Sequence, residues 1–422
     1  MELLYDIKDF FRIKDQHIKI TKVDNETHTT ILYAILDYPA GNCAHCSGQM
    51  IKYDFQKVSK VPYLENAGYP TVILLKKRRF QCKSCKKVQV AETSLVKKNH
   101  QISTPVYQKI TQKLLENKTV TDVSKELLVS PNTVQRQLDL MEIKEDYTRL
   151  PTCMSWDEFS FVNSSMCFIV QDFYTQKLIT ILDGLTQATI LKYFMKYSQK
   201  VRSKVKFITM DMYTPYFDIV KKLFPKAKIV IDRFHVVQHM SRALNKTRIS
   251  IMKGLDRKSL AYRSMKKFWR LLLKDFEKTS EERYYDWTFR LHLTNRERIE
   301  KILEFSEELR THYELYQTLL HHLKNKNKDL FKETVEEELE SCNDYFKTVF
   351  TTFKKLGDKI DNAIQYAYHN GKLEAANGKI KRIKRNACGF RNFDSLKKRV
   401  LLHLNQEKVA GRGPLSRLEI AA

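Results

Sequence analysis

The sequence predicts an α/β protein with two small domains in its first third and a mixed sheet in its second half. Two Cys-x-x-Cys motifs mark the first domain, and three short helical patterns mark the second. After residue 150, strand-like runs alternate with helical patterns. With 422 residues, the chain is long enough for two or three domains with sizeable cores.

The charge balance narrows the class of partner. The chain has 75 lysines and arginines against 49 acids, a formal net charge of +26. Such an excess predicts a polyanionic partner, usually a nucleic acid, and we expect double-stranded DNA. No apolar run approaches the about 18 residues of a membrane-spanning helix, and the N-terminal residues lack a signal-peptide pattern. We therefore expect no membrane partner and a cytoplasmic, nucleoid-associated location.

The N-terminal region, residues 1–98, contains the two cysteine motifs, which are Cys43, Cys46, Cys82 and Cys85. Four thiolates complete the closed tetrahedral shell of a structural Zn²⁺, and strand-like runs at 50–55 and 71–75 between the motifs fit a zinc ribbon. Two unrelated pairs of buried thiols are the alternative. The remaining cysteines lack such spacing and are expected to be free thiols: Cys153, Cys167, Cys342 and Cys388.

Cations crowd the second cysteine motif. Nine lysines and arginines between residues 76 and 98 face a single acid, Glu92. We expect a ribbon with this charge to touch the DNA backbone. A merely solvated basic face is the alternative.

Residues 100–146 predict a helix-turn-helix domain. In the second helical pattern Thr121 is the expected N-cap, and Val123, Leu127 and Leu128 are the expected apolar positions. Ser130-Pro131 is a typical start for the third helix. The outward residues near that start would meet DNA bases: Asn132, Thr133, Gln135 and Arg136. A three-helix domain with a purely structural role is the alternative.

From residue 152 the hydrophobic period changes. Strands are predicted at 152–162, 166–173, 177–182, 205–210 and 228–231, and helices at 186–197 and 215–223. Three antiparallel strands followed by alternating helix and strand are the order of an RNase H-like catalytic core, which we assign to residues 150–403. Residues 236 to about 357 break the pattern and predict a helical insertion, with Trp269 and Trp287 among its apolar positions. Residues 404–422 form a C-terminal tail.

Three acids fall where elements of such a core would meet. Asp157 lies within the first strand, Asp211 ends the fourth, and Glu374 begins a late helix that Asn370-Gly371 introduces. The two strands are neighbours in an RNase H-like sheet, so the three carboxylates can hold two divalent cations about 4 Å apart. Oxygen ligands and a phosphate substrate favour Mg²⁺, with Mn²⁺ as a substitute.

The acids also have ordinary structural alternatives. Glu158 follows Asp157, and only one of the two can point inward because adjacent strand residues face opposite sides of a sheet. Asp211 and Asp232 end strands, where an acid often caps the next helix. The Asp232-Arg233-Phe234-His235 motif has three possible roles: it supports the metal ligands, it contacts DNA, or it forms an internal Asp–Arg pair.

The late helix has two different faces. Its apolar positions can dock on a core: Leu373, Ala376, Ile380, Ile383 and Ala387. Its polar face carries Glu374, Asn377, Lys381 and Arg385. The cations after Glu374 are expected to hold DNA phosphates: Lys379, Lys381, Arg382, Lys384 and Arg385. A solvated salt-bridge face is the alternative.

Four ordered motifs, together with the cysteines, resemble the bacterial insertion-sequence transposases of the ISL-three type. The motifs are Ser155-Trp156-Asp157-Glu158-Phe159, Ile208-Thr209-Met210-Asp211-Met212-Tyr213, Asp232-Arg233-Phe234-His235-Val236, and the Glu374 region through Gly389-Phe390-Arg391-Asn392. The resemblance spans roughly residues 40–403. It implies a DDE enzyme with a zinc finger, a helix-turn-helix and an RNase H-like core.

The resemblance selects Asp157 over Glu158 and implies that Asp157, Asp211 and Glu374 form the catalytic, metal-binding triad. The implied activity is Mg²⁺-dependent strand cleavage and strand transfer on DNA, after binding of the terminal inverted repeats. Two paired ends imply at least a homodimer, for which the helical insertion is the expected interface. A nuclease or resolvase without strand transfer, or a non-enzymatic DNA-binding regulator, are the alternatives.

Overall fold

A computed structural model of the chain describes residues 7–116, 118–143, 145–162, 165–387, 389–390 and 392–405. The chain divides into two compact units. One takes in the residues up to 144 and those from 379 on, and the other takes in residues 145–378. No helix within the described ranges is both long and apolar enough to cross a membrane.

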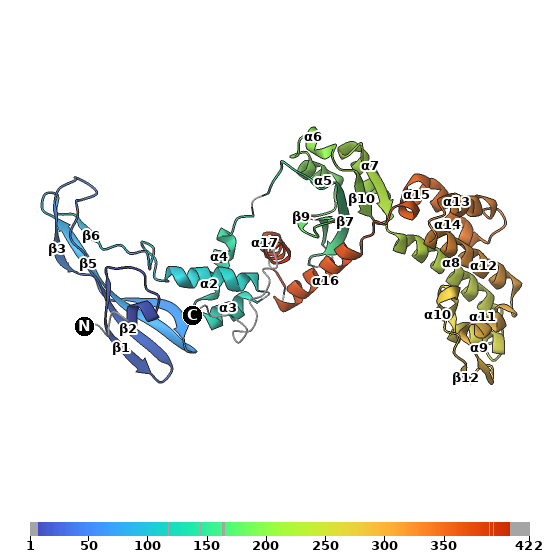
Figure 1. The fold of residues 1–422 in the computed structure, drawn as a ribbon, viewed down its shortest axis with the longest axis horizontal. Helices are drawn as coiled ribbons and strands as arrows, with labels where there is room; N and C mark the ends of the chain where they lie inside the picture. The colour runs from blue at the N-terminus through green and yellow to red at the C-terminus, as the bar shows by residue number, and fades with distance from the viewer. Residues whose placement is uncertain are drawn as a thin grey trace, which may run out of the picture. The chain divides into compact units, whose positions relative to one another are not determined.

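A six-stranded sheet forms the first part of the N-terminal unit (Figure 1). Its strands are β1 (Ile18–Glu26), β2 (Thr29–Leu36), β3 (Met50–Phe55), β4 (Ser59–Asn66), β5 (Tyr69–Cys82) and β6 (Val88–Val90). The long β5 organises the sheet: its first half pairs with β2 and β4, and its second half pairs with β3 and β6. The sequence analysis predicted β3 and part of β5, whereas β1, β2 and β4 were not predicted.

A group of four helices completes this unit: α2 (Thr104–Leu115), α3 (Val120–Glu126), α4 (Pro131–Leu140) and α17 (Phe393–Leu404). The first three are the predicted helices, and Ser130 caps α4 with Pro131 in the first turn, as expected. In α3, however, the N-cap is Thr119, which forms a capping box with Asp122. The prediction of Thr121 was wrong because Thr119, three residues before Asp122, completes the reciprocal pair of bonds.

Two further details of this helical group differ from the predictions. Leu128, an expected apolar core position, is 59% exposed, since its left-handed φ of 53° ends the turn after α3. Helix α17 was assigned to the catalytic core, yet it packs against α2 and α4. Gln135 donates to Ser395 Oγ at 3.2 Å, which joins α4 to α17.

The central unit is built on a five-stranded sheet with the order β11-β10-β7-β8-β9. The strands are β7 (Cys153–Ser160), β8 (Met166–Asp172), β9 (Leu178–Asp183), β10 (Phe207–Met210) and β11 (Lys228–Ile231). Strands β7, β8 and β9 are antiparallel neighbours, whereas β10 runs parallel to both β7 and β11. All five predicted strands are therefore present: β11 has the predicted ends, and the ends of the other four differ by at most two residues.

Helices α5 (Gln187–Phe194) and α7 (Thr214–Leu223) are the predicted ones, and the short α6 (Gln199–Arg202) between them was not predicted. The fully buried Trp156 of β7 stacks on Phe194 of α5, with 5.5 Å between the ring centroids, and contacts Tyr216 of α7. The next residue on that side of β7, Glu158, accepts a hydrogen bond from the Tyr216 hydroxyl at 2.6 Å. Because side chains alternate along a strand, Ser155 and Asp157 face the opposite side of the sheet.

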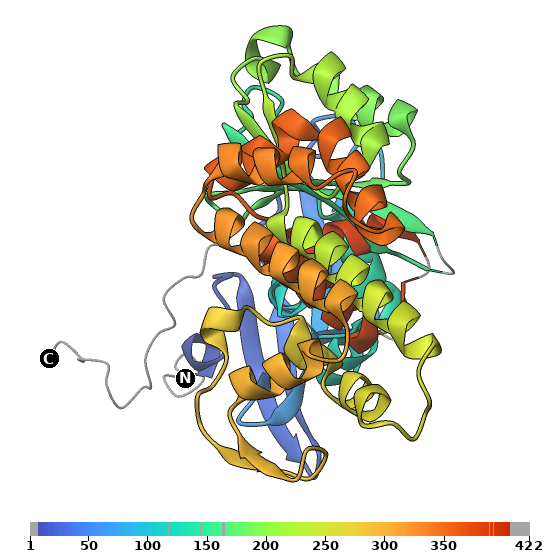
Figure 2. The same ribbon diagram turned by 90° about the vertical axis from the view of Figure 1, so that its right-hand side faces the viewer.

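A helical insertion separates β11 from the last part of the unit. It consists of α8 (Arg233–Lys253), α9 (Leu260–Lys267), α10 (Trp269–Leu272), a short 3₁₀ turn (Phe276–Lys278), β12 (Tyr284–Asp286), β13 (Leu291–Leu293), α11 (Asn295–Leu303), α12 (Glu307–Lys324), α13 (Lys328–Glu337), α14 (Asp344–Lys355) and α15 (Gly357–Gln365). Helices α12 and α14 lie alongside α8 (Figures 1 and 2), and α15 returns to pack on β11.

The insertion was predicted as helical with both tryptophans at apolar positions, and two features differ. Strands β12 and β13 form an antiparallel hairpin that was not predicted. Trp287 follows β12 and is 80% exposed, so its assignment to an apolar core was wrong. A run of apolar residues reports hydrophobicity, but it does not distinguish a core from an exposed hairpin.

Helix α16 (Gly371–Asn386) begins at the predicted Asn370-Gly371 turn. Four of the five predicted apolar positions are buried, since Leu373, Ala376, Ile380 and Ile383 are each at most 6% exposed, whereas Ala387 follows the end of the helix and is half-buried. Glu374 lies one turn from the start of the helix and is exposed. The helix is therefore fixed to the core by its apolar face, while Glu374 projects from its exposed side.

Candidate active site and zinc site

The register of β7 and β10 brings two of the predicted acids to the same level. The parallel strands pair Cys153 with Phe207 and Ser155 with Thr209. Continuing this register by two residues puts Asp211 level with Asp157. Asp157 is two residues after Ser155, and Asp211 is two residues after Thr209. Because side chains alternate along a strand, the two acids face the same side of the sheet as Ser155 and Thr209. The Thr209 hydroxyl lies 2.9 Å from Ser155 Oγ on that face.

The three acids share one electrostatic environment. Burial is the largest cause that raises the pKa of Asp157 to about 6, and the charges of Asp211, Glu158 and Glu374 add to it, against a lowering by the Glu158 N–H. Carboxylates that repel one another in this way are neutralised by a cation. Their hard oxygen donors fit Mg²⁺ or Mn²⁺ rather than a soft metal. The charges of Asp211 and Glu374 therefore act on Asp157, but the three carboxylates are not all within 4.8 Å of one another.

Asn377 connects α16 directly to Asp157. Its Nδ2 donates to Asp157 Oδ2 at 2.7 Å and to the Glu158 carbonyl oxygen at 3.3 Å. Asn377 is 8% exposed, and its Oδ1 is buried without a hydrogen-bond partner. The residue therefore fixes the orientation of one acid and leaves an oxygen acceptor beside it. Helical spacing predicted Asn377 on the Glu374 face, but no local pattern pointed to its contact with Asp157.

His235 orients the second acid. Its Nε2 lies 2.9 Å from Asp211 Oδ1, and the side chains are 25% and 45% exposed, respectively. The hydrogen bond to Asp211 is the main cause that raises the pKa of His235 above its usual value. His235 stands in the first turn of α8, so the helix that leads into the insertion also supports the acid.

Asp232 has a structural role that the sequence left open. It is 5% exposed, caps α8 by accepting from the Phe234 N–H at 2.9 Å, and accepts from the Asn370 N–H at 2.7 Å. This burial excludes a direct DNA contact. Arg233 donates instead to the carbonyl oxygens of Ala363 and Ile364, so an internal Asp–Arg pair is not what the motif forms.

Asn370 links four elements at the start of α16. Its Nδ2 donates to the Trp156 carbonyl oxygen at 3.1 Å, and its Oδ1 accepts from the Thr209 hydroxyl at 2.5 Å. The residue is 1% exposed and its carbonyl oxygen accepts from the Glu374 N–H at 2.9 Å. Together with its bond to Asp232, this network sets the position from which Glu374 projects. The turn signal at Asn370-Gly371 could have pointed to this residue, but only as a helix start.

The predicted DNA contacts on α4 are only partly available. Asn132 and Arg136 are exposed. Thr133 was expected to face outward, but it is 8% exposed and its hydroxyl lies 2.9 Å from Ser130 Oγ, since it stands in the capped first turn. Gln135 is half-buried and bonded to α17. On α16 the predicted phosphate contacts are exposed, apart from the half-buried Lys384: Lys379, Lys381, Arg382 and Arg385.

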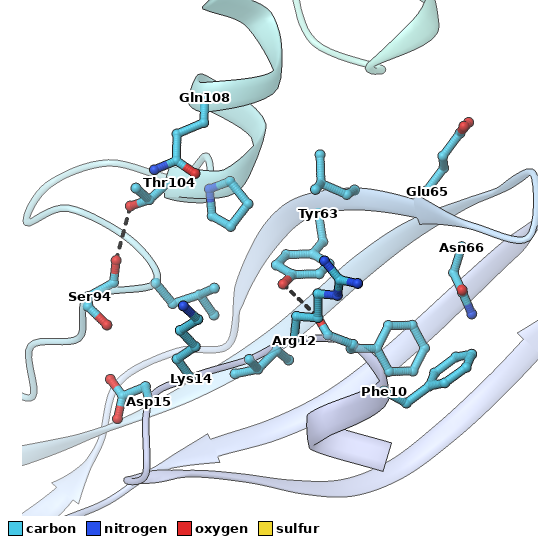
Figure 3. A pocket seen from close by; sticks show the side chains of 15 residues that line it. Phe10, Arg12, Lys14, Asp15, Tyr63, Glu65, Asn66, Ser94, Thr104 and Gln108 are labelled. Carbon is cyan, nitrogen blue, oxygen red and sulfur yellow. Dashed lines mark hydrogen bonds between the residues drawn. The ribbon is translucent and has the colours of Figure 1, made fainter. Parts of the chain in front are cut away.

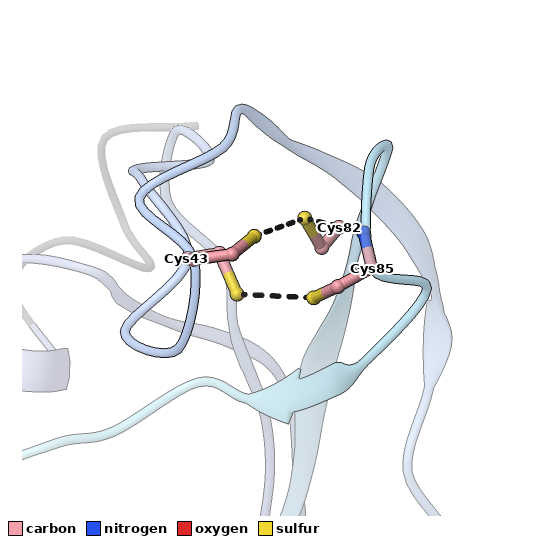
Figure 4. Close-up of side chains that lie close together, drawn as sticks. Cys43, Cys82 and Cys85 are labelled. Carbon is pink, nitrogen blue, oxygen red and sulfur yellow. Dashed lines mark hydrogen bonds between the residues drawn. The ribbon is translucent and has the colours of Figure 1, made fainter.

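The four motif cysteines form the second site (Figure 4). The Sγ atoms of Cys43 and Cys85 are 3.7 Å apart, and those of Cys46 and Cys82 are 3.5 Å apart. Among the described residues, these cysteines are the group of metal-binding side chains whose ligand atoms all lie within 4.8 Å of one another. A tetrahedral Zn²⁺ with Zn–S bonds of about 2.3 Å requires sulfur separations of about 3.8 Å. The cluster therefore fits structural zinc.

Backbone N–H groups favour the thiolate at two of the four cysteines, whereas at Cys85 one backbone N–H is outweighed by burial and the neighbouring sulfurs, which raise its pKa to about 11. N–H groups of His45 and Cys46 lower the pKa of Cys43, and the N–H of Cys85 lowers that of Cys82 to about 6. Each motif turns through a residue in the left-handed region directly after its second cysteine, Ser47 with φ 57° and Lys86 with φ 58°. The two motifs are thus equivalent turns that present sulfur ligands.

The cations around the second motif are partly neutralised within the sheet. Arg79 pairs with Asp54, and Arg78 pairs with Asp37 at 3.0 Å. Glu92 was predicted as the single acid near these cations. Asp37 and Asp54 were missed because they lie far earlier in the sequence and reach Arg78 and Arg79 through the pairing of the strands. Six lysines around the motif remain exposed: Lys76, Lys83, Lys86, Lys87, Lys97 and Lys98.

Other candidate positions lie away from both sites. An open hollow of about 460 Å³ in the N-terminal unit is lined by Phe10, Tyr63 and Gln108, among others, and contains none of the predicted site residues (Figure 3). The Tyr63 hydroxyl donates to the Phe11 carbonyl oxygen at 2.7 Å, which closes its floor. Cys153, Cys167 and Cys342 are free thiols as predicted, and Cys388 lies outside the described residues.

Comparison with known proteins agrees with this geometry over most of the chain. A family model described as a transposase, of the DDE type and the ISL3 family, matches residues 154–400. A second model, described as the zinc-finger of transposases IS204, IS1001, IS1096 and IS1165, matches residues 39–85. The matches include all three acids and all four motif cysteines.

Two curated relatives are similar to the chain over different lengths. A protein named "ATP-dependent protease" from Lactococcus lactis subsp. lactis is 37% identical over 122 residues, 29% of this chain and 39% of that protein's length. The transposase for insertion sequence element IS1001 from Bordetella parapertussis is 21% identical over 361 residues, 83% of this chain and 85% of the relative. The family model spans the whole five-stranded sheet from Met154 on and all three acids, and the IS1001 transposase is similar over most of the chain. The chain belongs to the ISL3 family of insertion-sequence DDE transposases.

Proposed function

We propose that the chain binds the terminal inverted repeats of an insertion sequence and catalyses strand cleavage followed by strand transfer. What supports this proposal is the register of β7 and β10, which, continued by two residues, puts Asp211 level with Asp157, together with the charge of Glu374, which contributes to the raised pKa of Asp157. The strand order β11-β10-β7-β8-β9 supports an RNase H-like core. The family supports the transposase class, and the geometry supports the residue roles.

Asp157, Asp211 and Glu374 would hold Mg²⁺, or Mn²⁺ in its place. When bound, such cations supply positive charge to the attacking oxygen, the phosphoryl group and the leaving oxygen during in-line displacement. Asn377 keeps the Asp157 carboxylate in one orientation, and His235 does the same for Asp211. The Asn370 network positions the helix from which Glu374 projects.

The N-terminal unit would recognise DNA. Helices α2 to α4 would act as a helix-turn-helix, with Asn132 and Arg136 as its base or backbone contacts and Gln135 restricted by its bond to Ser395. The zinc ribbon would add backbone contacts through its exposed lysines. The exposed cations of α16 would hold phosphates of the strand that is cut. Because two ends must be joined, we propose at least a homodimer.

Glu374→Gln tests the proposal. The variant should lose metal-dependent cleavage of an element-end duplex by at least about 100-fold, because an amide removes one ligand charge. Binding of the same duplex should change by less than about threefold. Glu158→Gln is the matched control, since Glu158 contacts Tyr216 on the other face of the sheet and its loss should spare cleavage. Cleavage that survives in Glu374→Gln would remove the triad assignment.

Strand transfer separates a transposase from a nuclease or resolvase. A duplex with a pre-cut 3′ end at the element terminus should be joined to a second DNA by the wild-type chain. Cleavage without joining would support the nuclease, and binding without cleavage would support a DNA-binding regulator.

A further inference from the structure

The helical insertion has a strongly uneven distribution of charge. Residues 242–274, which run from α8 to the end of α10, contain eleven lysines and arginines and a single acid, Asp256. Residues 275–355 contain fourteen cations and eighteen acids. Several cations of the second segment pair with its own acids, as Arg310 does with Glu300 at 3.0 Å. The first segment has almost no internal acids with which to pair, so it is suited to an external anion.

Part of this segment encloses a hollow of about 500 Å³. Four of its lining side chains are cations and none is acidic: Arg248, Lys253, Arg257 and Lys266. Two aromatic rings, Tyr262 and Trp269, complete the walls. The positive charge of this lining attracts anionic phosphate groups and repels cationic ligands.

One cation of the hollow, Arg248, is buried and held in place, whereas Lys253, Arg257 and Lys266 are exposed. Arg248 is 7% exposed and donates to the Met265 carbonyl oxygen at 3.0 Å and to Asn245 Oδ1 at 2.8 Å. Lys266 Nζ lies 5.9 Å from the centre of the Tyr262 ring, within the range of a cation–π contact. Preorganised cations lose less conformational entropy when they bind an anion.

We infer that this hollow binds the sugar-phosphate backbone of the DNA that the enzyme cuts. The inference rests on the proposed function, because it requires DNA at the acids. Helix α8 extends from His235, which contacts Asp211, to Lys253, which lines the hollow. Eighteen residues of α-helix span about 27 Å. That distance corresponds to about eight base pairs of B-DNA, so the hollow grips the duplex within one helical turn of the scissile phosphate.

A pair of matched triple variants tests the contact. Lys253, Arg257 and Lys266 are exposed and are each replaced by alanine, in full-length protein that also carries Glu374→Gln to prevent cleavage. The control replaces Lys301, Lys326 and Lys354 of the second segment by alanine, so that it loses the same charge as the pocket variant. Fluorescence anisotropy measures affinity for an element-end duplex from 50 to 300 mM KCl, and thermal unfolding checks that each variant folds.

The pocket variant should bind roughly tenfold more weakly, and its slope of log K against log salt should fall by about two to three. The control slope should change by less than about one. Equal losses in the two variants would show a general charge effect and overturn the inference.

A length series tests the position of the contact. Duplexes are extended from the cleavage site in steps of two base pairs, first on one side and then on the other. In one series the affinity of the parent should rise when the extension reaches about eight base pairs, and the pocket variant should lack this rise. A lower salt slope without any length threshold would keep the DNA contact but contradict the proposed location of the active site. No difference between parent and variant in either measurement would remove the inference itself.

Discussion

Asn377 of α16 donates a hydrogen bond to Asp157 of β7, with 2.7 Å between Nδ2 and Oδ2. The two residues are 220 positions apart in sequence. The bond joins the helix that carries Glu374 to the strand that carries the first acid, and it leaves Asn377 Oδ1 buried without a partner. One amide therefore links two of the three proposed metal ligands.

Asn377→Ala should reduce strand cleavage by roughly 10- to 100-fold, because the orientation of a metal ligand depends on its supporting hydrogen bonds. Affinity for the element-end duplex should change by less than about threefold. Asn386→Ala, an exposed asparagine at the end of the same helix, is the control and should cleave normally. Cleavage kinetics over a Mg²⁺ titration should show the loss mainly as a higher metal requirement. An unchanged titration would contradict the positioning role.

Asn370→Ala should destabilise the chain by about 2–4 kcal/mol. The substitution leaves the Thr209 hydroxyl and the Trp156 carbonyl oxygen without their buried partner, and such groups are costly to leave unpaired. Asn362→Ala removes one side-chain bond to the Ile229 carbonyl oxygen and should cost about 1 kcal/mol. Urea unfolding of both variants measures the difference. Equal costs would show that the Asn370 network has no special stabilising role.

Gly48→Ala should weaken zinc binding. A Cβ at this position would lie 2.8 Å from Ser84 Oγ and 3.3 Å from Cys46 Sγ, so the two cysteine motifs would have to move apart. Gly41→Ala is the control, because a Cβ there meets no atom within 4 Å. Zinc release to a chelator should be faster for Gly48→Ala than for the control. Adding Ser84→Ala should restore part of the affinity, and a failure to do so would point to another cause.

The buried ion pair of Asp286 and Arg298 should make the β12–β13 hairpin sensitive to acid. The two side chains are 4% and 5% exposed and 2.7 Å apart. Burial acts to raise the pKa of Asp286, but hydrogen bonds from Thr288, Phe289 and Arg298 outweigh it, so the pKa is lowered. A carboxyl with a lowered folded-state pKa contributes stability above its unfolded pKa of about 4 and loses it as the pH falls further.

Asp286→Asn should therefore lower the melting temperature at pH 7 and differ less from wild type near pH 3. Asp329→Asn, at an exposed position of α13, should show little difference at either pH. Thermal unfolding at the two pH values measures both effects. A gap between wild type and Asp286→Asn that widens toward low pH would contradict the lowered pKa.

Much of the local structure was predictable because it depends on neighbouring residues. The α4 start at Ser130-Pro131, the α16 start at Asn370-Gly371 and the ends of β3 and β11 all follow from capping, turn and period signals. The four cysteines were predictable because Cys-x-x-Cys spacing directs two thiolates to one side of a turn. The errors at Thr133, Leu128 and Trp287 concern burial, which depends on what packs above a residue.

By itself the sequence determined the order of the strands in the central sheet and the four clustered cysteines, since these rest on local periodicity and motif spacing, and the assignment of the three acids remains a prediction from the family resemblance. Only the tertiary structure decided which face of β7 carries Asp157, that His235 and Asn377 hold the acids, and that α17 packs with α2 and α4. The physical reason is range. Strand register and buried hydrogen bonds join residues more than fifty positions apart, and no local pattern encodes which distant partner a polar side chain will find.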